Sequence, residues 1–77
     1  MNSNYSLYDI TPGQKARISS LCSAGSIRRR LLDIGLVKDT EVECIGQSPS
    51  GNPKAFLIRG AVIAIREQDC KNILIHF

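Results

Sequence analysis

The chain has 77 residues, which is the length of one domain and leaves little volume for a deep substrate cleft. Its hydrophobic content of 43% and charged content of 22% exclude a disordered chain. A net charge of +3 permits contact with nucleic acid without requiring it, and two tyrosines with two phenylalanines are few for a base-stacking platform. We expect one folded domain, residues 1–77, with a binding surface rather than an enclosed pocket.

The three cysteines indicate a reduced compartment. They are odd in number and widely spaced, whereas a secreted scaffold of this length usually carries an even and denser set. Residues 1–6 lack the basic start and the apolar run of a signal peptide. No stretch approaches the ~20 apolar residues that span a bilayer. We therefore expect a cytoplasmic protein without membrane insertion.

The first expected elements are a turn and a strand. Residues 11–14 carry Pro12 and Gly13 at the positions that a type II turn favours. Over residues 15–21 the side chains alternate, with Ala16 and Ile18 on one face and polar or charged side chains on the other. This period of two predicts a half-buried strand.

Residues 26–34 are the segment with convincing helical periodicity. Ser23 or Ser26 can cap its start, and Gly35 suits the left-handed residue that ends a helix. The core stripe expected from helical spacing comprises Ile27, Leu31 and Ile34. The segment is therefore predicted to be a short amphipathic helix.

The remaining helical positions carry positive charge and one leucine outside the stripe. The arginine triplet at residues 28–30 spreads over the flanks and back of the helix. Arg29 can pair with Asp33, four residues further on. Leu32 lies about 100° from the centre of the core stripe, so the expected core does not account for it.

Four more strands are expected after the helix. They are predicted at residues 40–46, 54–59, 61–66 and 73–77. Val42 and Cys44 share one face of the first of them. Gly60 lies between the middle two, which predicts a tight hairpin.

The connections and the last strand complete the predicted fold. Residues 48–53 are all turn formers and are expected to be the most mobile loop, and residues 67–72 read as a short turn. The last strand places Ile73, Ile75 and Phe77 on one face. Five short strands, with one helix after the first strand, predict a mostly β fold. A small SH3-like antiparallel β-barrel is expected, because closure hides the sheet edges.

Several pieces of the sequence occur in a characteristic order. They begin with Gly25 and residues 28–36. They continue through residues 40–43, 48–53, 58–60 and 63–66 to Asp69. This order, spread over residues 7–77, resembles the ferrous iron transport protein A (FeoA) family. The chain departs from the family pattern at Lys38 and Asp39, where a Pro-Gly pair is common, and this departure concerns the local turn rather than the fold.

The resemblance implies both a fold and a role. It implies an SH3-like barrel in the bacterial cytoplasm, with a supporting role in ferrous iron uptake through contact with the cytoplasmic GTPase portion of the membrane transporter FeoB. It supplies no catalytic residue and no cofactor. A related domain is appended to iron-dependent repressors, so a regulatory module of such a repressor is the alternative.

Neither a metal site nor an enzymatic site is expected. The three cysteines and His76 show none of the CxxC or HxxxH spacings that bring ligands to one ion, so we interpret the cysteines as small buried hydrophobes. His76 is predicted on the outer face of the last strand, with no nucleophile beside it. Glu41 and Glu43 share a strand face and are interpreted as solvated surface acids. No glycine-rich phosphate loop is present.

The expected functional surface lies on the helix and the segment that follows it. Its predicted members are Arg28, Arg29, Leu32, Leu36 and Val37. Exposed arginine around an apolar anchor is a typical interface composition. The alternatives are a solvated helix surface for the arginines and a cover of barrel loops for the leucine. The turn at residues 48–53 is a second candidate surface.

Three functions remain open at this point. We favour an adaptor that contacts FeoB. A nucleic-acid-binding barrel has only the arginine triplet and the basic charge in its favour, and an iron carrier is disfavoured by the ligand spacing. Weak self-association through a sheet edge is also left open.

Overall fold

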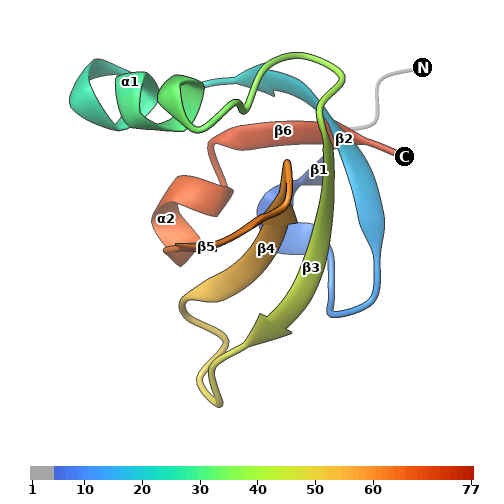
Figure 1. The fold of residues 1–77 in the computed structure, drawn as a ribbon. Helices are drawn as coiled ribbons and strands as arrows, with labels where there is room; N and C mark the ends of the chain where they lie inside the picture. The colour runs from blue at the N-terminus through green and yellow to red at the C-terminus, as the bar shows by residue number, and fades with distance from the viewer. Residues whose placement is uncertain (1–4) are drawn as a thin grey trace.

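The computed structural model describes residues 5–77 and contains one antiparallel sheet of six strands. The elements in chain order are β1 (Tyr5–Ser6), the 3₁₀ helix η1 (Leu7–Asp9), β2 (Lys15–Leu21), α1 (Gly25–Asp33), β3 (Glu41–Gln47), β4 (Lys54–Ile58), β5 (Ala61–Ile65), α2 (Glu67–Cys70) and β6 (Ile73–His76). The strand order is β1-β6-β2-β3-β4-β5, and the sheet curls around one hydrophobic core (Figure 1). The mostly β, SH3-like fold class is confirmed. No helix within residues 5–77 has the length and apolar content needed to cross a membrane.

The N-terminal segment supplies a strand that the sequence did not predict. β1 pairs with β6, and its two residues are too few to show periodicity. Ser6 then caps η1, since its hydroxyl accepts a hydrogen bond from Tyr8 N at 3.2 Å while the Asp9 carboxylate accepts one from Ser6 N at 2.8 Å. Leu7 and Ile10 are fully buried. The sheet therefore has six strands rather than five, and α1 follows its second strand rather than its first.

β2 and β3 form where the alternating pattern predicts them, within one residue at each end. Their buried side chains are Ala16, Ile18, Val42 and Cys44. β2 lies between β3 and β6 in the sheet, with Ala16 opposite Val42 in the β2–β3 ladder. The side chains that alternate toward the inner face of β2 and β3 therefore form one side of the core.

β4 and β5 form the predicted tight hairpin. Its two-residue turn is Arg59-Gly60, and both residues have positive φ, 50° and 84°, as a type I′ turn requires. The longer turn before β4 is organised by one hydroxyl. Ser48 Oγ donates to Asn52 O at 2.8 Å and accepts a hydrogen bond from Asn52 N at 3.0 Å.

A buried lysine joins the N-terminal segment to the sheet. Lys54 is 7% exposed, and its ammonium group donates to Tyr8 O at 2.7 Å and to Ile10 O at 2.9 Å. The same ammonium lies 5.1 Å from the centre of the Tyr8 ring. A buried ammonium without such partners is costly, so these contacts permit the burial of Lys54 at the start of β4.

Residues 67–72 contain the one-turn helix α2 rather than a simple turn. Asn52 Oδ1 accepts a hydrogen bond from Glu67 N at 2.8 Å, and Lys71 pairs with Glu67 at 3.2 Å. Cys70 is fully buried, and its thiol donates a hydrogen bond to Ile65 O at 3.6 Å. The helix therefore returns the chain from β5 to β6 with its last side chain in the core.

β6 is one residue shorter than predicted. Its pairing with β2 ends at His76, and Ile73 and Ile75 are buried as expected. Phe77 is 64% exposed, so its predicted place on their face is wrong. Beyond the end of the ladder its ring packs edge-on against the Tyr5 ring, with the ring centres 5.3 Å apart.

Candidate docking surface

The start of α1 is tied to the barrel by an arginine rather than by a serine cap. Among residues 5–77 no side chain caps the helix, so the predicted cap by Ser23 or Ser26 is wrong, and Ser23 Oγ is buried with no hydrogen-bond partner in that range. Arg28 Nη1 donates to Leu21 O at 3.0 Å. This bond links the first half of the helix to the end of β2.

The end of α1 is closed by the backbone. Gly35 has φ of 96°, and its N–H donates to Leu32 O at 3.0 Å, while Leu36 N donates to Leu31 O at 3.0 Å. This pair of bonds is a Schellman motif, which brings the residue after the glycine onto the last turn of the helix. Leu36 is therefore fully buried beside Leu31. The prediction that Leu36 belongs to an exposed docking surface is wrong, because the chain reverses at Gly35 instead of continuing the helical direction.

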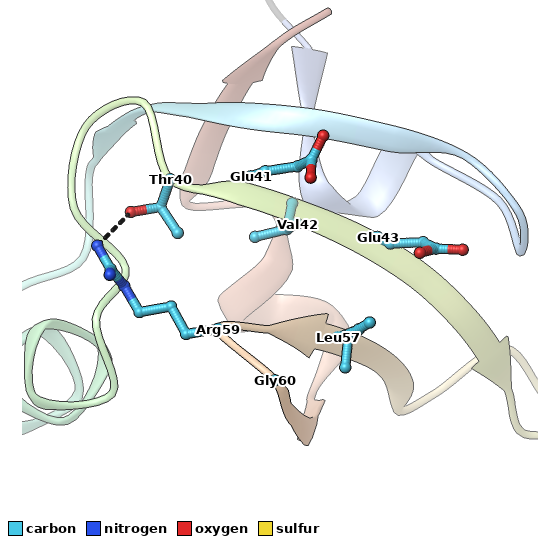
Figure 2. Close-up of a pocket in the computed structure, with 7 residues that line it drawn as sticks. All are labelled: Thr40, Glu41, Val42, Glu43, Leu57, Arg59 and Gly60. Atoms are coloured by element: carbon cyan, nitrogen blue, oxygen red, sulfur yellow. Dashed lines mark hydrogen bonds between the residues drawn. The ribbon is translucent and has the colours of Figure 1, made fainter.

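A second set of bonds fixes the helix end to the β4–β5 hairpin. Arg59 Nε donates to Gly35 O at 3.1 Å, and Arg59 Nη2 lies 3.4 Å from Thr40 Oγ1, as the dashed line in Figure 2 marks. Thr40 Oγ1 itself donates to Gly35 O at 3.0 Å. A Cβ on Gly35 would lie 2.5 Å from Arg59 Cδ, so only glycine permits this close approach. The helix end, the start of β3 and the hairpin turn are thus held together.

The exposed side of this rigid segment carries two large apolar side chains. Leu32 is 39% exposed and Val37 is 43% exposed. Together with Arg28 they line a depression of about 290 Å³ between α1 and β2, and Arg29 lines an adjoining depression on the helix. We call Arg28, Arg29, Leu32 and Val37 the helix patch. The structure brings these four predicted residues together, and their role in binding stays a prediction.

The charges of the helix patch are not neutralised by the predicted helical ion pair. Within residues 5–77, no ion pair involves Arg29 or Asp33. Both residues lie on the exposed side of α1, where an ion pair contributes little because water screens it. The guanidinium of Arg29 therefore remains on the surface beside Leu32.

A different depression runs along the outer face of β3, and Glu41 and Glu43 lie on its lining (Figure 2). The β2–β3 register places Glu41 opposite Arg17 and Glu43 opposite Lys15. Each carboxylate thus has a basic cross-strand neighbour, which is the arrangement of solvated surface charges. It does not resemble the pair of closely facing carboxylates that acid-base catalysis uses.

The thiols and the imidazole are dispersed over the molecule. Cys44 and Cys70 are buried, as the interpretation of the cysteines requires, but Cys22 is exposed and contradicts it. Burial raises the pKa of the Cys70 thiol to about 12, so the thiol stays protonated at neutral pH and is a poor metal ligand. His76 Nε2 lies 3.3 Å from Asp39 Oδ1 on the surface. Nowhere in residues 5–77 do three His, Cys, Asp or Glu side chains gather as a possible metal site.

Arg59 and Thr40 are the positioning residues that could not be found from the sequence. Arg59 lies 24 positions from Gly35, in a hairpin turn with no local signal for a long-range contact. Gly35 carried the only hint, since a glycine can mark a close approach of side chain to backbone as well as a helix end. These two residues orient the helix patch without belonging to it.

Comparisons with known proteins agree with the fold. The FeoA domain family model matches residues 5–76. The solution structure of the FeoA protein from Chlorobium tepidum is 26% identical, with a TM-score of 0.89 over 95% of this chain and 70% of that chain. A FeoA-like protein from Clostridium acetobutylicum is 28% identical, with a TM-score of 0.86 over 99% of this chain and 88% of that chain. No curated protein matches the chain in sequence.

Two more distant structures share the fold alone. FeoA from Stenotrophomonas maltophilia, described as a prokaryotic SH3 domain protein complexed with zinc, is 24% identical, with a TM-score of 0.82 over 92% of this chain and 88% of that chain. A manganese-dependent transcriptional repressor is 14% identical, with a TM-score of 0.86 over 99% of this chain and 37% of that chain. The SH3-like barrel therefore recurs in chains of different length.

Proposed function

Because the chain belongs to the FeoA family, which is associated with ferrous iron transport, we propose that it is an accessory protein of bacterial ferrous iron uptake. In this proposal it acts in the cytoplasm and docks through the helix patch onto the cytoplasmic, GTPase-bearing region of the membrane transporter FeoB. The chain itself carries out no reaction, and its effect on uptake comes from the contact.

The observation that carries the proposal is the composition of the helix patch. Leu32 and Val37 are large, apolar and exposed, and Arg28 and Arg29 lie beside them. Protein interfaces combine apolar anchors with arginine in this way, and a few such residues supply most of the binding energy.

The way in which the helix patch is mounted also favours docking. Arg28 bonds to Leu21 O at one end of α1, and Arg59 bonds to Gly35 O at the other. Binding to a surface that is already ordered loses less conformational entropy than binding to a mobile segment. The bonds at both ends of α1 therefore prepare the helix patch for a partner.

The proposal is tested by measuring binding to the purified cytoplasmic region of FeoB with isothermal titration calorimetry. We expect Leu32→Ala to weaken binding at least about tenfold, because it removes the apolar anchor. The double variant Arg28→Glu with Arg29→Glu should weaken it by at least as much, because it places two carboxylates around that anchor.

A matched control separates a local effect from a change in overall charge. Lys15→Glu with Arg66→Glu changes the net charge by the same amount on exposed residues of β2 and of the segment after β5. We expect this control to bind like the wild type. Wild-type binding by the folded Leu32→Ala and arginine variants, or no binding by the wild type itself, would refute the proposal.

A further inference from the structure

The two edges of the sheet differ in length and chemistry. Within residues 5–77, β1 ends the sheet with two residues, whereas β5 ends it with five, Ala61–Ile65, which contain neither charge nor proline (Figure 1). Val62 is 65% exposed, and Ala61 and Ala64 are exposed as well. Sheet edges are normally blunted by charge, proline or short length, because an open edge pairs with other strands. β5 has none of these protections.

The hairpin register fixes which backbone groups of β5 are free. Ile58 and Ala61 flank the two-residue turn, so they form a hydrogen-bonded pair, and such pairs alternate along an antiparallel ladder. Ala61 and Ile63 therefore direct their backbone groups toward β4, while Val62 and Ala64 direct theirs outward. Among residues 5–77, no hydrogen bond outside the β4–β5 ladder involves the backbone of Val62 or Ala64. Two donors and two acceptors thus lie on the open edge.

We infer that β5 is the contact through which two copies of this chain pair, antiparallel and about a two-fold axis at Ile63. This register sets Val62 opposite Ala64 of the second copy and Ala64 opposite its Val62. Each of these two pairs exchanges two N–H···O bonds, so all the outward groups of both strands find partners. The twelve-stranded sheet that results runs continuously through both copies.

The side chains of β5 are compatible with their own copies. On the outer face, the exposed Val62 lies opposite the small Ala64 of the second copy. On the other face, Ile63 meets Ile63 of the second copy at the two-fold axis. Ile63 is only partly buried and lines a groove of about 360 Å³ with Ile27 of α1 and with Ile34, the residue that follows the helix. Pairing therefore covers apolar surface without opposing like charges.

Charge favours a second copy over a charged foreign strand. The charged side chains that line the groove beside β5 are Arg30, Asp33, Arg66 and Asp69. Their signs balance, so the groove selects neither an acidic nor a basic partner. The uncharged strand that suits it is β5 itself. Two strands of five residues make a small interface, so the dimer is expected to be weak and transient, with a dissociation constant on the order of 0.1–1 mM.

The test combines sedimentation equilibrium with amide hydrogen exchange by NMR, from about 10 µM to about 1 mM protein. We expect the wild type to dimerise with rising concentration, and the amides of Val62 and Ala64 to become protected in parallel. The amides of Ala61 and Ile63 should be protected at every concentration, because their partners lie in β4.

Two variants and one control identify the edge as the contact. Val62→Lys places a charge on the open strand, and Ala64→Pro removes only an outward N–H, so each should weaken dimerisation at least about tenfold. Leu57→Lys adds the same charge on β4, the neighbouring strand, and should dimerise as the wild type does. Continued protection of the Ile63 amide shows that each variant is folded.

Three results would overturn the inference. They are a wild type that stays monomeric up to about 1 mM, a dimer in which Val62 and Ala64 exchange as fast as in the monomer, and a Val62→Lys variant that dimerises normally. Protection of these two amides only by a foreign protein would assign the edge to that protein and would equally overturn self-pairing. The three results with the purified chain do not depend on FeoB, so any of them leaves the proposed function untouched.

Discussion

Leu31 and Leu32 are neighbours on the same helix, yet they belong to two different regions of the molecule. Leu31 is 4% exposed and packs in the core with the strands, whereas Leu32 is 39% exposed and lies on the helix patch. Both residues have the same chemistry and the same helix propensity. The difference shows that location, rather than residue type, separates a side chain that stabilises the fold from one that is free to bind a partner.

The two regions are also held in different ways. The core is stabilised by burial of apolar side chains from the five strands β2 to β6 and from η1, α1 and α2. The helix patch is held from beneath by polar bonds, from Arg28 to Leu21 O and from Arg59 to Gly35 O. Changes in the core should therefore alter stability first, and changes in the helix patch should alter binding first.

The largest expected effect on stability comes from a core substitution, and comparing it with its neighbour in the helix patch tests the difference between the two regions most clearly. Leu31→Ala should lower the free energy of unfolding by about 2–5 kcal/mol, because it removes buried methyl groups and leaves a cavity. Leu32→Ala should change it by less than about 0.5 kcal/mol, because the side chain is already exposed. Urea unfolding followed by circular dichroism measures both. Equal losses for the two variants would contradict the division.

A smaller loss is expected at the buried ammonium. Lys54→Met keeps much of the side-chain volume but leaves the carbonyls of Tyr8 and Ile10 without their donor, which should cost about 1–3 kcal/mol of unfolding free energy. The exposed Lys15→Met is the matched control and should be nearly neutral. A neutral Lys54→Met would mean that the two hydrogen bonds of Lys54 make no net contribution to stability.

The junction between the regions is tested at two glycines. Gly35→Ala should cost about 1–2 kcal/mol of unfolding free energy from its positive φ, and more from the contact with Arg59. Gly25→Ala shares the positive φ, but a Cβ there meets nothing within 4 Å, so it isolates the backbone cost. Denaturant midpoints of the two variants give the difference. Equal losses of unfolding free energy would show that the Arg59 side chain moves aside at no cost and does not fix the helix end.

The smallest effect depends on pH. Burial holds the pKa of the Cys70 thiol at about 12, against 9.0 in the unfolded chain, so the folded state keeps this proton over a range in which the unfolded state loses it. Stability should therefore fall as the pH rises above about 9, by roughly 1 kcal/mol at pH 10. The Cys70→Val variant should show a flatter decline in melting temperature between pH 8 and pH 10. An identical decline would show that other groups cause it.

Much of the barrel follows from the sequence because its signals are local. Alternation predicted β2 and β3, the isolated Gly60 predicted the hairpin turn, and Gly35 predicted the helix end. β1 could not be predicted, since two residues carry no period. Leu36 is buried because the backbone hydrogen bonds at the helix end reverse the chain at Gly35. A helical wheel that continues past the glycine places Leu36 on the exposed side instead.

The helix patch was predictable in part for the same reason. Leu32 stood out because helical spacing alone places it off the core stripe, and the structure leaves it exposed. The contact of Arg59 with Gly35 and Thr40 was beyond prediction, because it joins segments that only the folded sheet brings together. Helical spacing in the sequence therefore predicted residues of the helix patch. The residues that orient the patch, Arg59 and Thr40, could be identified only from the folded structure.

The most direct test of docking is an NMR titration of the ¹⁵N-labelled chain with the purified cytoplasmic region of FeoB. We predict that the amide signals of the helix patch, at Arg28, Arg29, Leu32 and Val37, shift or broaden first, while those at the start of β2 and at the end of β3 stay unchanged. Saturable changes confined to the turn at residues 48–53 or to the outer face of β3, or no change at all, would contradict the claim that the helix patch is the docking surface.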